Sequence, residues 1–308
     1  MIQLVFPLFI LFIGLLTLCI LWRINSRKYI SSGTVASAYD AWTKDKLLER
    51  LWGEHIHLGF YATGKQNIDF REAKVQFVHK LVNWSGLDKL PKGSRILDVG
   101  CGIGGSSRIL AKYYGFNVTA ITISPAQVKR ARELTPSGLN CNFLVMDALN
   151  LKFEDGSFDA VWSVEAGAHM NDKNKFADEM LRILRPGGYL AIADWNSRDL
   201  GTKPPSLLEK IVLKQLLEQW VHPRFISIND FNHILNINKN SSGNVVSENW
   251  NFFTNPSWND SILEGLRRPQ TILSLGPGAI IKSLREIPTI VLMDWAFKKG
   301  LMEFGVYK

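Results

Sequence analysis

Short apolar runs alternate with amphipathic stretches through the middle of the chain, between residues 86 and 200. The runs at residues 95–99, 116–123, 141–146, 158–164 and 189–193 have the length of buried strands. The stretches at 107–114, 124–134 and 178–184 have helical spacing, and turn residues separate them from the runs. Strand and helix thus alternate with short connections, which predicts an α/β domain with a doubly wound parallel sheet.

The first predicted strand leads directly into a glycine-rich turn. Residues 96–107 read Ile-Leu-Asp-Val-Gly-Cys-Gly-Ile-Gly-Gly-Ser-Ser, so an acid stands near the strand's end and four glycines follow within six residues. Glycine allows a left-handed backbone and a close approach to a ligand, and the N–H groups that begin the next helix point into the turn. The pattern therefore predicts a binding site for a nucleotide-like ligand.

Two ligands can be compared for this turn, NAD and S-adenosylmethionine. Gly100, Gly102 and Gly105 match the dinucleotide fingerprint, but Asp98 would repel a pyrophosphate. The second strand ends at Thr122 and Ser124, without the acid that binds the ribose of NAD. A cationic nucleoside without phosphates fits better, and the turn resembles motif I of the class I methyltransferases. An NAD-dependent dehydrogenase stays the alternative.

The N-terminal stretch predicts a membrane anchor. Residues 1–22 carry no charge and only Gln3 and Thr17 as polar side chains, and about 20 such residues cross a bilayer core. Positive residues follow at 23, 27 and 28, so we expect a single-pass helix within residues 1–30 and the catalytic domain on the cytoplasmic side. A cleaved signal peptide is the alternative, although the stretch lacks a leading positive charge.

The segments on either side of the central domain are less regular. Residues 31–85 are rich in aromatic side chains and include Glu54, His55 and His57 between glycines. A third or fourth ligand at usable spacing is not evident, so we expect no metal; a cover over the active site and a packed loop are the other two interpretations. Residues 201–308 contain an amphipathic helix at 206–220 and a candidate strand at 245–253. Charges interrupt residues 272–297, which favours core or a membrane surface over a second span.

The net charge and the cysteine content limit the classes of binding partner and the redox compartment that we expect. The 36 basic and 28 acidic side chains give a formal charge of +8, which suits nucleic acid or an anionic membrane surface. Because no nucleic-acid motif is present, we favour the membrane and expect no nucleic acid and no obligate protein partner. The three cysteines have no metal spacing and suggest no disulfide framework, as in a reducing compartment.

Five motifs together resemble the tocopherol-pathway quinol methyltransferases. They lie at residues 52–59, 97–107, 121–125, 164–170 and 184–188, and the resemblance runs from about Tyr39 to the C-terminus. Within this family, residues 193–196, 210–220 and 281–286 are more similar to the cyanobacterial members that act on 2-methyl-6-phytyl-1,4-benzoquinol than to the γ-tocopherol methyltransferases. The resemblance implies a class I Rossmann-like fold with a helical cap.

It also implies a reaction, in which S-adenosylmethionine methylates a ring carbon of a prenylated quinol. A γ-tocopherol methyltransferase, a sterol-like C-methyltransferase and a non-catalytic membrane-tethered S-adenosylmethionine-binding protein stay as alternatives. A base of near-neutral pKa would activate the phenol, so His169 is the first candidate, with Glu165, His55 and His57 as others. The resemblance implies that Thr122, Ser124 and Gln127 bind the ribose of S-adenosylmethionine. The expected residues for S-adenosylmethionine are Asp98, Gly100, Cys101, Gly102, Gly104, Gly105, Thr122, Ser124, Gln127, Asp147, Ala148 and Glu165.

These expectations divide the chain into four parts. We predict an anchor at 1–30, a cap segment at 31–85, a Rossmann-like core at 86–200, and substrate-side helices that complete the sheet at 201–308.

Overall fold

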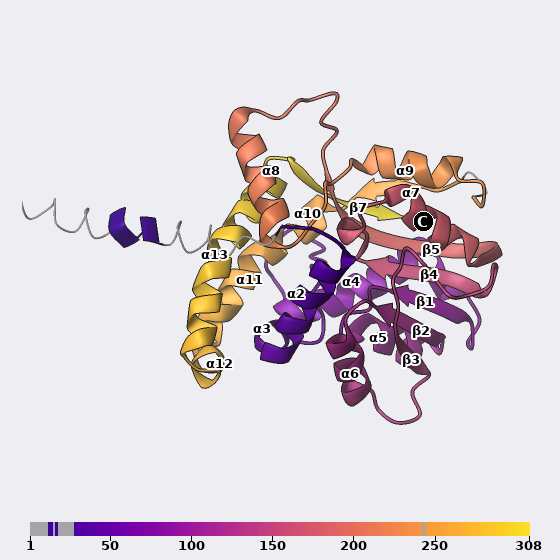
Figure 1. Ribbon diagram of the computed structural model, residues 1–308. Coiled ribbons are helices and arrows are strands. Elements are labelled where there is room, and N and C mark those ends of the chain that lie inside the picture. The colour runs from indigo at the N-terminus through magenta and orange to yellow at the C-terminus, as the bar shows by residue number, and fades with distance from the viewer. Residues whose placement is uncertain (1–11, 15, 18–27, 242–243) are drawn as a thin grey trace, which may run out of the picture.

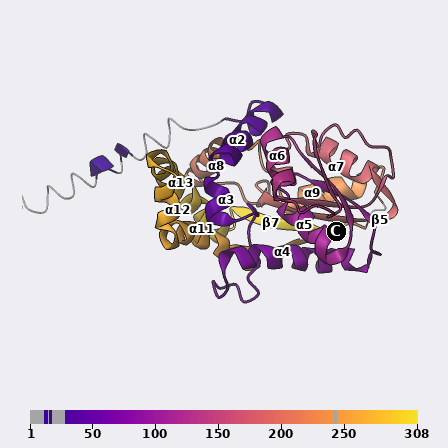
Figure 2. The ribbon, with the colours of Figure 1, turned by 90° about the horizontal axis from the view of Figure 1, so that it is seen from below.

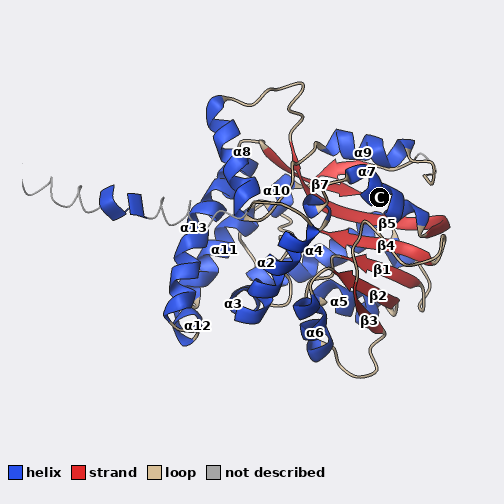
Figure 3. Ribbon diagram, in the orientation of Figure 1, coloured by secondary structure: helices blue, strands red, loops and turns tan. Residues whose placement is uncertain are grey.

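A seven-stranded sheet forms the centre of the computed structural model, which describes residues 12–14, 16–17, 28–241 and 244–308 (Figure 1). In spatial order the strands are β3-β2-β1-β4-β5-β7-β6. β1 to β5 pair in parallel, whereas β7 runs antiparallel between β5 and β6 (Figure 3). The strands are β1 Arg95–Val99, β2 Asn117–Thr122, β3 Cys141–Val145, β4 Phe158–Val164, β5 Leu184–Ser197, β6 Ser247–Asn249 and β7 Met302–Tyr307.

The strand order reverses between β1 and β4, which lie side by side at the centre. In a doubly wound sheet a ligand binds outside the carboxyl ends of the strands at this reversal. The fold therefore places the ends of β1 and β4, at Val99 and Val164, beside the ligand crevice.

Helices cover both faces of the sheet. Neighbouring residues of a strand point to opposite faces, so Ile96 packs in one apolar cluster and Leu97 in the other. The first cluster contains side chains of α4 Phe70–Ser85, α5 Gly105–Tyr114 and α6 Pro125–Leu134. The second contains side chains of α7 Lys173–Arg182 and α9 Ile228–Ile237. This three-layer arrangement confirms the predicted class I Rossmann-like α/β fold.

A second group of helices gathers beyond the carboxyl ends of the parallel strands (Figures 1 and 2). It consists of α2 Ser32–Asp45, α3 Leu47–Trp52, α8 Leu207–Gln219, α10 Asn251–Thr254, α11 Pro256–Arg267, α12 Pro269–Ser274 and α13 Pro277–Lys298. Two short 3₁₀ turns, at Leu87–Lys89 and Gly167–His169, lie outside this group. Residues from both termini thus build the wall that faces the crevice.

The predicted membrane anchor needs correction. Among the described residues, no helix is long and apolar enough to cross a bilayer. A spanning helix needs about 20 mainly apolar residues, whereas α13, the longest described helix with 22 residues, contains Lys282, Arg285, Glu286 and Asp294. Residues 12–14 and 16–17 are helical, and the rest of the apolar run at 1–22 lies outside the described residues. The assignment as a single-pass membrane protein is therefore not supported.

Candidate active site

The loop after β1 has the backbone that its glycines were expected to provide. Gly100, Gly102 and Gly104 have φ angles of 77°, 55° and 83°, in the left-handed region. A Cβ on Gly100 would lie 2.2 Å from the Cβ of Ala166, so the loop and the end of β4 are in close contact there. A Cβ on Gly102 would meet nothing nearer than Gln127 Nε2 at 4.0 Å. Gly102 therefore faces open space, as a ligand-binding glycine should.

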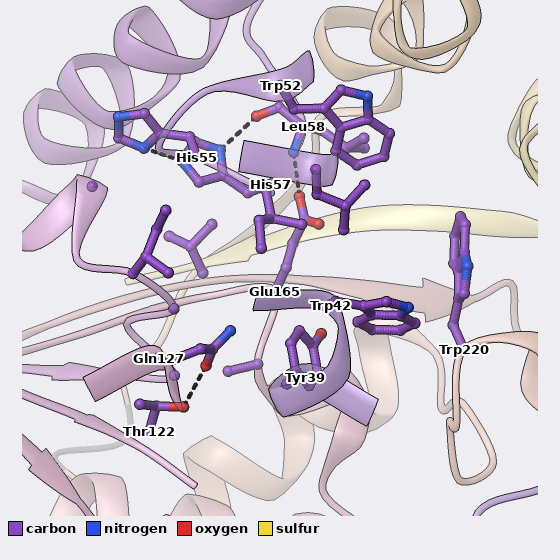
Figure 4. A pocket seen from close by; sticks show the side chains of 18 of the residues that line it. Tyr39, Trp42, Trp52, His55, His57, Leu58, Thr122, Gln127, Glu165 and Trp220 are labelled. Carbon is purple, nitrogen blue, oxygen red and sulfur yellow. Dashed lines mark hydrogen bonds between the residues drawn. The ribbon is translucent and has the colours of Figure 1, made fainter. Parts of the chain in front are cut away.

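That open space belongs to a cavity of about 240 Å³ that extends from the loop to a set of aromatic side chains. In Figure 4, Thr122 and Gln127 lie on one side of Glu165, and Trp42 and Trp220 lie on the other. Lining residues near the loop are Asp98, Gly100, Cys101, Gly102, Gly105, Thr122 and Gln127. The aromatic lining residues are Tyr39, Trp42, Trp52, His55, His57, Phe70, Trp162, His169, Trp195, Trp220, His222 and Trp258. One continuous cavity can therefore hold a nucleoside next to an aromatic ring.

Asp98 is the acid at the nucleoside end of this cavity. Its side chain is buried and accepts a hydrogen bond of 2.5 Å from the Ser107 hydroxyl. Burial raises the pKa of Asp98 to about 7, and the Ser107 hydrogen bond opposes this rise. A cation placed in the cavity would favour the ionised form of Asp98, so this group is suited to a positively charged ligand.

Side chains at the end of β2 and the start of α6 form a connected polar cluster. Thr122 donates to Gln127 Oε1 at 2.6 Å, and the Ser124 hydroxyl accepts from the Gln127 N–H at 3.2 Å. Ser124 also donates to Asp40 of α2, whose carboxylate accepts from the Ala126 N–H at 3.1 Å. A carboxylate is thus present at the end of β2, although it comes from a helix that precedes the domain. Through these two hydrogen bonds, Asp40 holds α2 against the N-terminus of α6, where the helix dipole is positive.

Glu165 lies immediately after β4, at the centre of the cavity (Figure 4). Its φ angle is 54°, a conformation that costs a residue with a Cβ about 1 kcal/mol or more. Its Oε1 accepts a hydrogen bond of 2.6 Å from the Leu58 N–H. Burial raises the pKa of Glu165 to about 8, the charge of Asp194 adds to the rise, and the Leu58 N–H and Lys74 oppose it. A strained, partly buried acid whose pKa lies near neutrality is a candidate for accepting a proton.

His169 lies in the 3₁₀ turn that follows β4 and contacts Tyr39 of α2. Its Nε2 is 2.8 Å from the Tyr39 hydroxyl, and its Nδ1 is 3.4 Å from the carbonyl oxygen of Val221. A carbonyl can only accept, so we assign the ring proton to Nδ1 and the Tyr39 hydroxyl as the donor to Nε2. Burial lowers the pKa of His169 to about 4 and raises that of Tyr39. His169 is therefore neutral, with both ring nitrogens hydrogen-bonded.

Tyr39→Phe tests this contact. The variant keeps the ring and its edge-to-face packing on His169 and Trp42 but loses the hydroxyl. We expect the free energy of unfolding to fall by about 1 kcal/mol, the usual net contribution of one hydrogen bond. We expect kcat to fall roughly tenfold, or about 1.4 kcal/mol, because His169 loses the hydrogen bond that orients its ring beside the cavity. Thermal unfolding and steady-state kinetics measure the two effects, and an unchanged kcat would assign Tyr39 to packing alone.

His55 and His57 form a hydrogen-bonded pair above the loop. His57 Nδ1 lies 2.8 Å from the carbonyl oxygen of Leu58, so Nδ1 donates and Nε2 accepts from His55 Nδ1 at 3.0 Å. Burial lowers the pKa of both imidazoles, that of His57 to about 3. The buried Lys74 ammonium donates to the His55 carbonyl oxygen at 2.8 Å. These bonds fix the peptide that presents the Leu58 N–H to Glu165.

Comparison with known proteins assigns the chain to a family. A methyltransferase domain matches residues 97–192. The 2-methyl-6-phytyl-1,4-hydroquinone methyltransferase of Synechocystis sp. is 54% identical over 94% of this chain and 91% of its own. The chain belongs to the tocopherol-pathway quinol methyltransferases. The chloroplastic tocopherol O-methyltransferase of Arabidopsis thaliana is 34% identical over 84% of this chain and 77% of its own.

A solved structure with low sequence identity shares the fold. It is a putative sarcosine dimethylglycine methyltransferase from Galdieria sulphuraria, with a TM-score of 0.72 and 22% identity, covering 85% of this chain and 96% of that one. The two chains therefore share the same overall fold.

In this quinol methyltransferase, most of the residues expected at the site lie around one cavity. Four residues expected to bind S-adenosylmethionine do not line it: Gly104, Ser124, Asp147 and Ala148. A Cβ on Gly104 would lie 2.7 Å from the Phe143 ring, which explains glycine there by packing. The Asp147 carboxylate accepts from the Leu149 N–H at 2.9 Å, within its own turn. Binding roles stay predictions both for these four residues and for the expected residues that line the cavity.

The sequence analysis did not single out several residues that the fold brings to the cavity. Tyr39 comes from α2, and His222 stacks on His169 with ring centroids 4.1 Å apart. Trp195, Trp220 and Trp258 also contact one another. These residues are far apart along the chain, so no local pattern relates them. The one hint in the sequence of an aromatic cavity was the high tryptophan content.

The raised pKa values predict how stability changes with pH. Burial of Glu165 and Asp98 favours their neutral forms, so the stability they contribute is fully present below about pH 4, their unfolded pKa range. It is lost as pH rises through about 7 for Asp98 and about 8 for Glu165. We therefore expect Glu165→Gln to become more stable relative to the parent enzyme between pH 5 and pH 9. Urea unfolding of ligand-free protein measures this, and a constant difference across that range would contradict it.

Proposed function

We propose that this enzyme transfers a methyl group from S-adenosylmethionine to a ring carbon of 2-methyl-6-phytyl-1,4-benzoquinol or a close prenylated relative. The observation that carries the proposal is the 54% identity, over nearly the whole chain, to a protein named for that activity. The cavity supports it, because a glycine loop suited to a nucleoside and a wall of aromatic side chains line the same space. The tryptophans favour a flat, apolar acceptor.

The loop and its neighbours fit S-adenosylmethionine. Gly102 leaves room for a ligand against the backbone, and Asp98 suits the ligand's positive charge. Thr122 and Gln127 provide polar groups for a ribose. When bound, S-adenosylmethionine supplies an electrophilic methyl group. The bulk of α2 and α3 beside the cavity would keep water from that methyl group.

We propose Glu165 as the group that accepts the acceptor's hydroxyl proton. Loss of this proton raises electron density at the neighbouring ring carbon, which bonds to the methyl group as the methyl–sulfur bond breaks. The ring carbon then loses its own proton to solvent, which makes the ring aromatic again as a phenolate. Glu165 returns the proton it accepted to the phenolate oxygen. Glu165 suits this role better than His169, since a base of pKa about 8 takes a phenolic proton more readily than one of about 4. His169, His55 and His57 then act by positioning.

The phytyl tail places the acceptor in a lipid bilayer. Each buried CH₂ group contributes about 0.8 kcal/mol to membrane partitioning, so a chain of this length stays in lipid. We propose that the enzyme takes its acceptor from there.

An assay with labelled S-adenosylmethionine and a panel of prenylated quinols tests the function. We expect label in a lipid-soluble product that carries the new methyl group on a ring carbon, as identified by NMR. A labelled tocopherol would support the reaction named for the second relative. Absence of transfer to every quinol would overturn the proposal.

A further inference from the structure

Exposed apolar side chains concentrate on the helices beside the cavity. Of the eighteen large apolar side chains that are exposed in the described part of the chain, nine lie on α8, α11, α12 and α13. These helices pack against one another at one end of the molecule, beyond the carboxyl ends of the parallel strands (Figures 1 and 2). The nine residues, which we call the end patch, are Leu207, Leu208, Ile211, Leu266, Leu273, Ile281, Leu284, Ile287 and Val291.

Helix α13 connects this patch with the cavity. Ile281, Leu284 and Val291 are 50–60% exposed and are spaced to lie along one side of the helix. Lys282, Glu286 and Ile290, each four residues apart, line the cavity from the opposite side. Glu286 also accepts a hydrogen bond of 3.1 Å from the Trp220 indole N–H. One helix therefore has an apolar outer side and an inner side that forms part of the active site.

Positive charge accompanies the patch. Lys210 and Lys214 are exposed on α8, next in sequence to Leu207, Leu208 and Ile211. Lys203 is exposed in the segment that precedes α8. None of these lysines forms an ion pair with another described residue, whereas Glu209 of the same helix is paired with Arg198. Apolar side chains next to free cations are typical of a surface that contacts anionic lipid.

We propose that the end patch rests on an anionic lipid surface, so that the acceptor passes from the bilayer along α13 into the cavity. The helices lie on the lipid and do not cross it. This inference deepens the proposed function and rests on it for the identity of the acceptor. A protein partner of neutral or positive charge explains the apolar residues but not the three lysines. A second copy of this chain would bring equal charges together.

A dye attached to the patch reports lipid contact at that place only. We would label Leu284→Cys in the full chain with an environment-sensitive thiol dye. The control is Ile237→Cys on α9, at a position that is 67% exposed against 50% for Leu284. The parent chain, labelled in parallel, provides the background from its own cysteines. Adding phosphatidylcholine vesicles that contain phosphatidylglycerol should shift the emission of the dye at 284 to the blue but not that at 237. No shift at 284 would overturn the proposal.

The same dye distinguishes other occupants of the patch. A blue shift at 284 without vesicles that grows with protein concentration would indicate a second copy. A shift without vesicles at every concentration would indicate that residues 1–30 cover the patch. Either result contradicts the proposal. Lys210→Glu/Lys214→Glu should weaken the blue shift of the dye at 284 only when the vesicles contain phosphatidylglycerol. An equal effect on neutral vesicles would contradict a contribution of these two lysines to binding anionic lipid.

Activity gives a second readout. We expect Ile281→Glu/Leu284→Glu to lower kcat/KM about tenfold, or about 1.4 kcal/mol, for a long-tailed quinol in vesicles. Activity on a short-tailed quinol in solution should stay within about twofold. Ile237→Glu/Val246→Glu, also at exposed apolar positions, is the matched control. Equal loss on both substrates would mean that α13 only shapes the cavity. If no quinol is methylated but the dye still shifts with lipid, the proposed function fails while the lipid surface stands.

Discussion

Gly102→Leu is expected to abolish S-adenosylmethionine binding while leaving the protein folded. A Cβ at Gly102 would point into the open space beside the loop, so a leucine side chain would occupy the volume that the ligand needs. We expect the affinity to fall roughly a hundredfold or more, a loss of at least about 2.7 kcal/mol. Isothermal titration calorimetry measures the affinity. Normal binding in this variant would show that the ligand lies elsewhere.

The φ angle of 55° at Gly102 also strains any residue with a Cβ, so the steric effect needs a matched control. Gly138 has a φ angle of 85°, and nothing lies within 4 Å of its added Cβ. Gly138→Leu therefore carries a similar backbone strain away from the cavity. Both variants should lose comparable stability in thermal unfolding, but only Gly102→Leu should lose S-adenosylmethionine binding. If both variants lost S-adenosylmethionine binding, backbone strain and not occupation of the cavity would explain the effect of Gly102→Leu.

Glu165→Gln is expected to lower kcat by roughly 10²–10⁴-fold, the usual contribution of a positioned proton acceptor. The amide oxygen of glutamine can still accept from the Leu58 N–H, so the local structure should persist. In the parent enzyme, kcat should rise with pH as Glu165 ionises around pH 8. Binding of a cation beside it would move this midpoint lower. The rise should disappear in the variant, which a pH profile of single-turnover rates can measure.

Glu133→Gln provides the control for this change. Glu133 is an exposed carboxylate on α6 that pairs with Arg130 at 2.8 Å, outside the cavity. The same chemical change there should leave kcat and its pH profile intact. If Glu165→Gln keeps the pH profile of the parent, the proton acceptor is a different group, and His169 becomes the next residue to replace.

The hydrophobic pattern predicts an element well when the apolar residues and the turn that ends the element lie within the same short stretch of sequence. β1 and β4 have the predicted bounds, 95–99 and 158–164, because each is an apolar run that ends at a turn or a loop. α7 begins at Lys173, earlier than the predicted 178, because the Asp172 side chain caps it by accepting from the Lys175 N–H. The predicted strand at 245–253 is only Ser247–Asn249, followed by α10.

Contacts between distant segments could not be predicted in this way. Asp40, which accepts a hydrogen bond from the Ser124 hydroxyl, lies 84 residues before Ser124, and no local signal relates the two. Likewise, Tyr39 is 130 residues from His169. The glycine loop was predictable because its backbone requirement is local. The partner of His169 depends on how α2 packs, and the partner of Glu165 depends on how the segment around Leu58 packs.

β7 makes the completion of the sheet depend on residues that come late in the chain. This strand lies between β5 and β6, and five of its six residues are buried. During synthesis β5 therefore has an unpaired, apolar edge until residues 302–307 have emerged from the ribosome. Such an edge is a template for pairing with other nascent chains. We therefore expect chains that stop before Met302 to aggregate, because β5 keeps this unpaired edge in them.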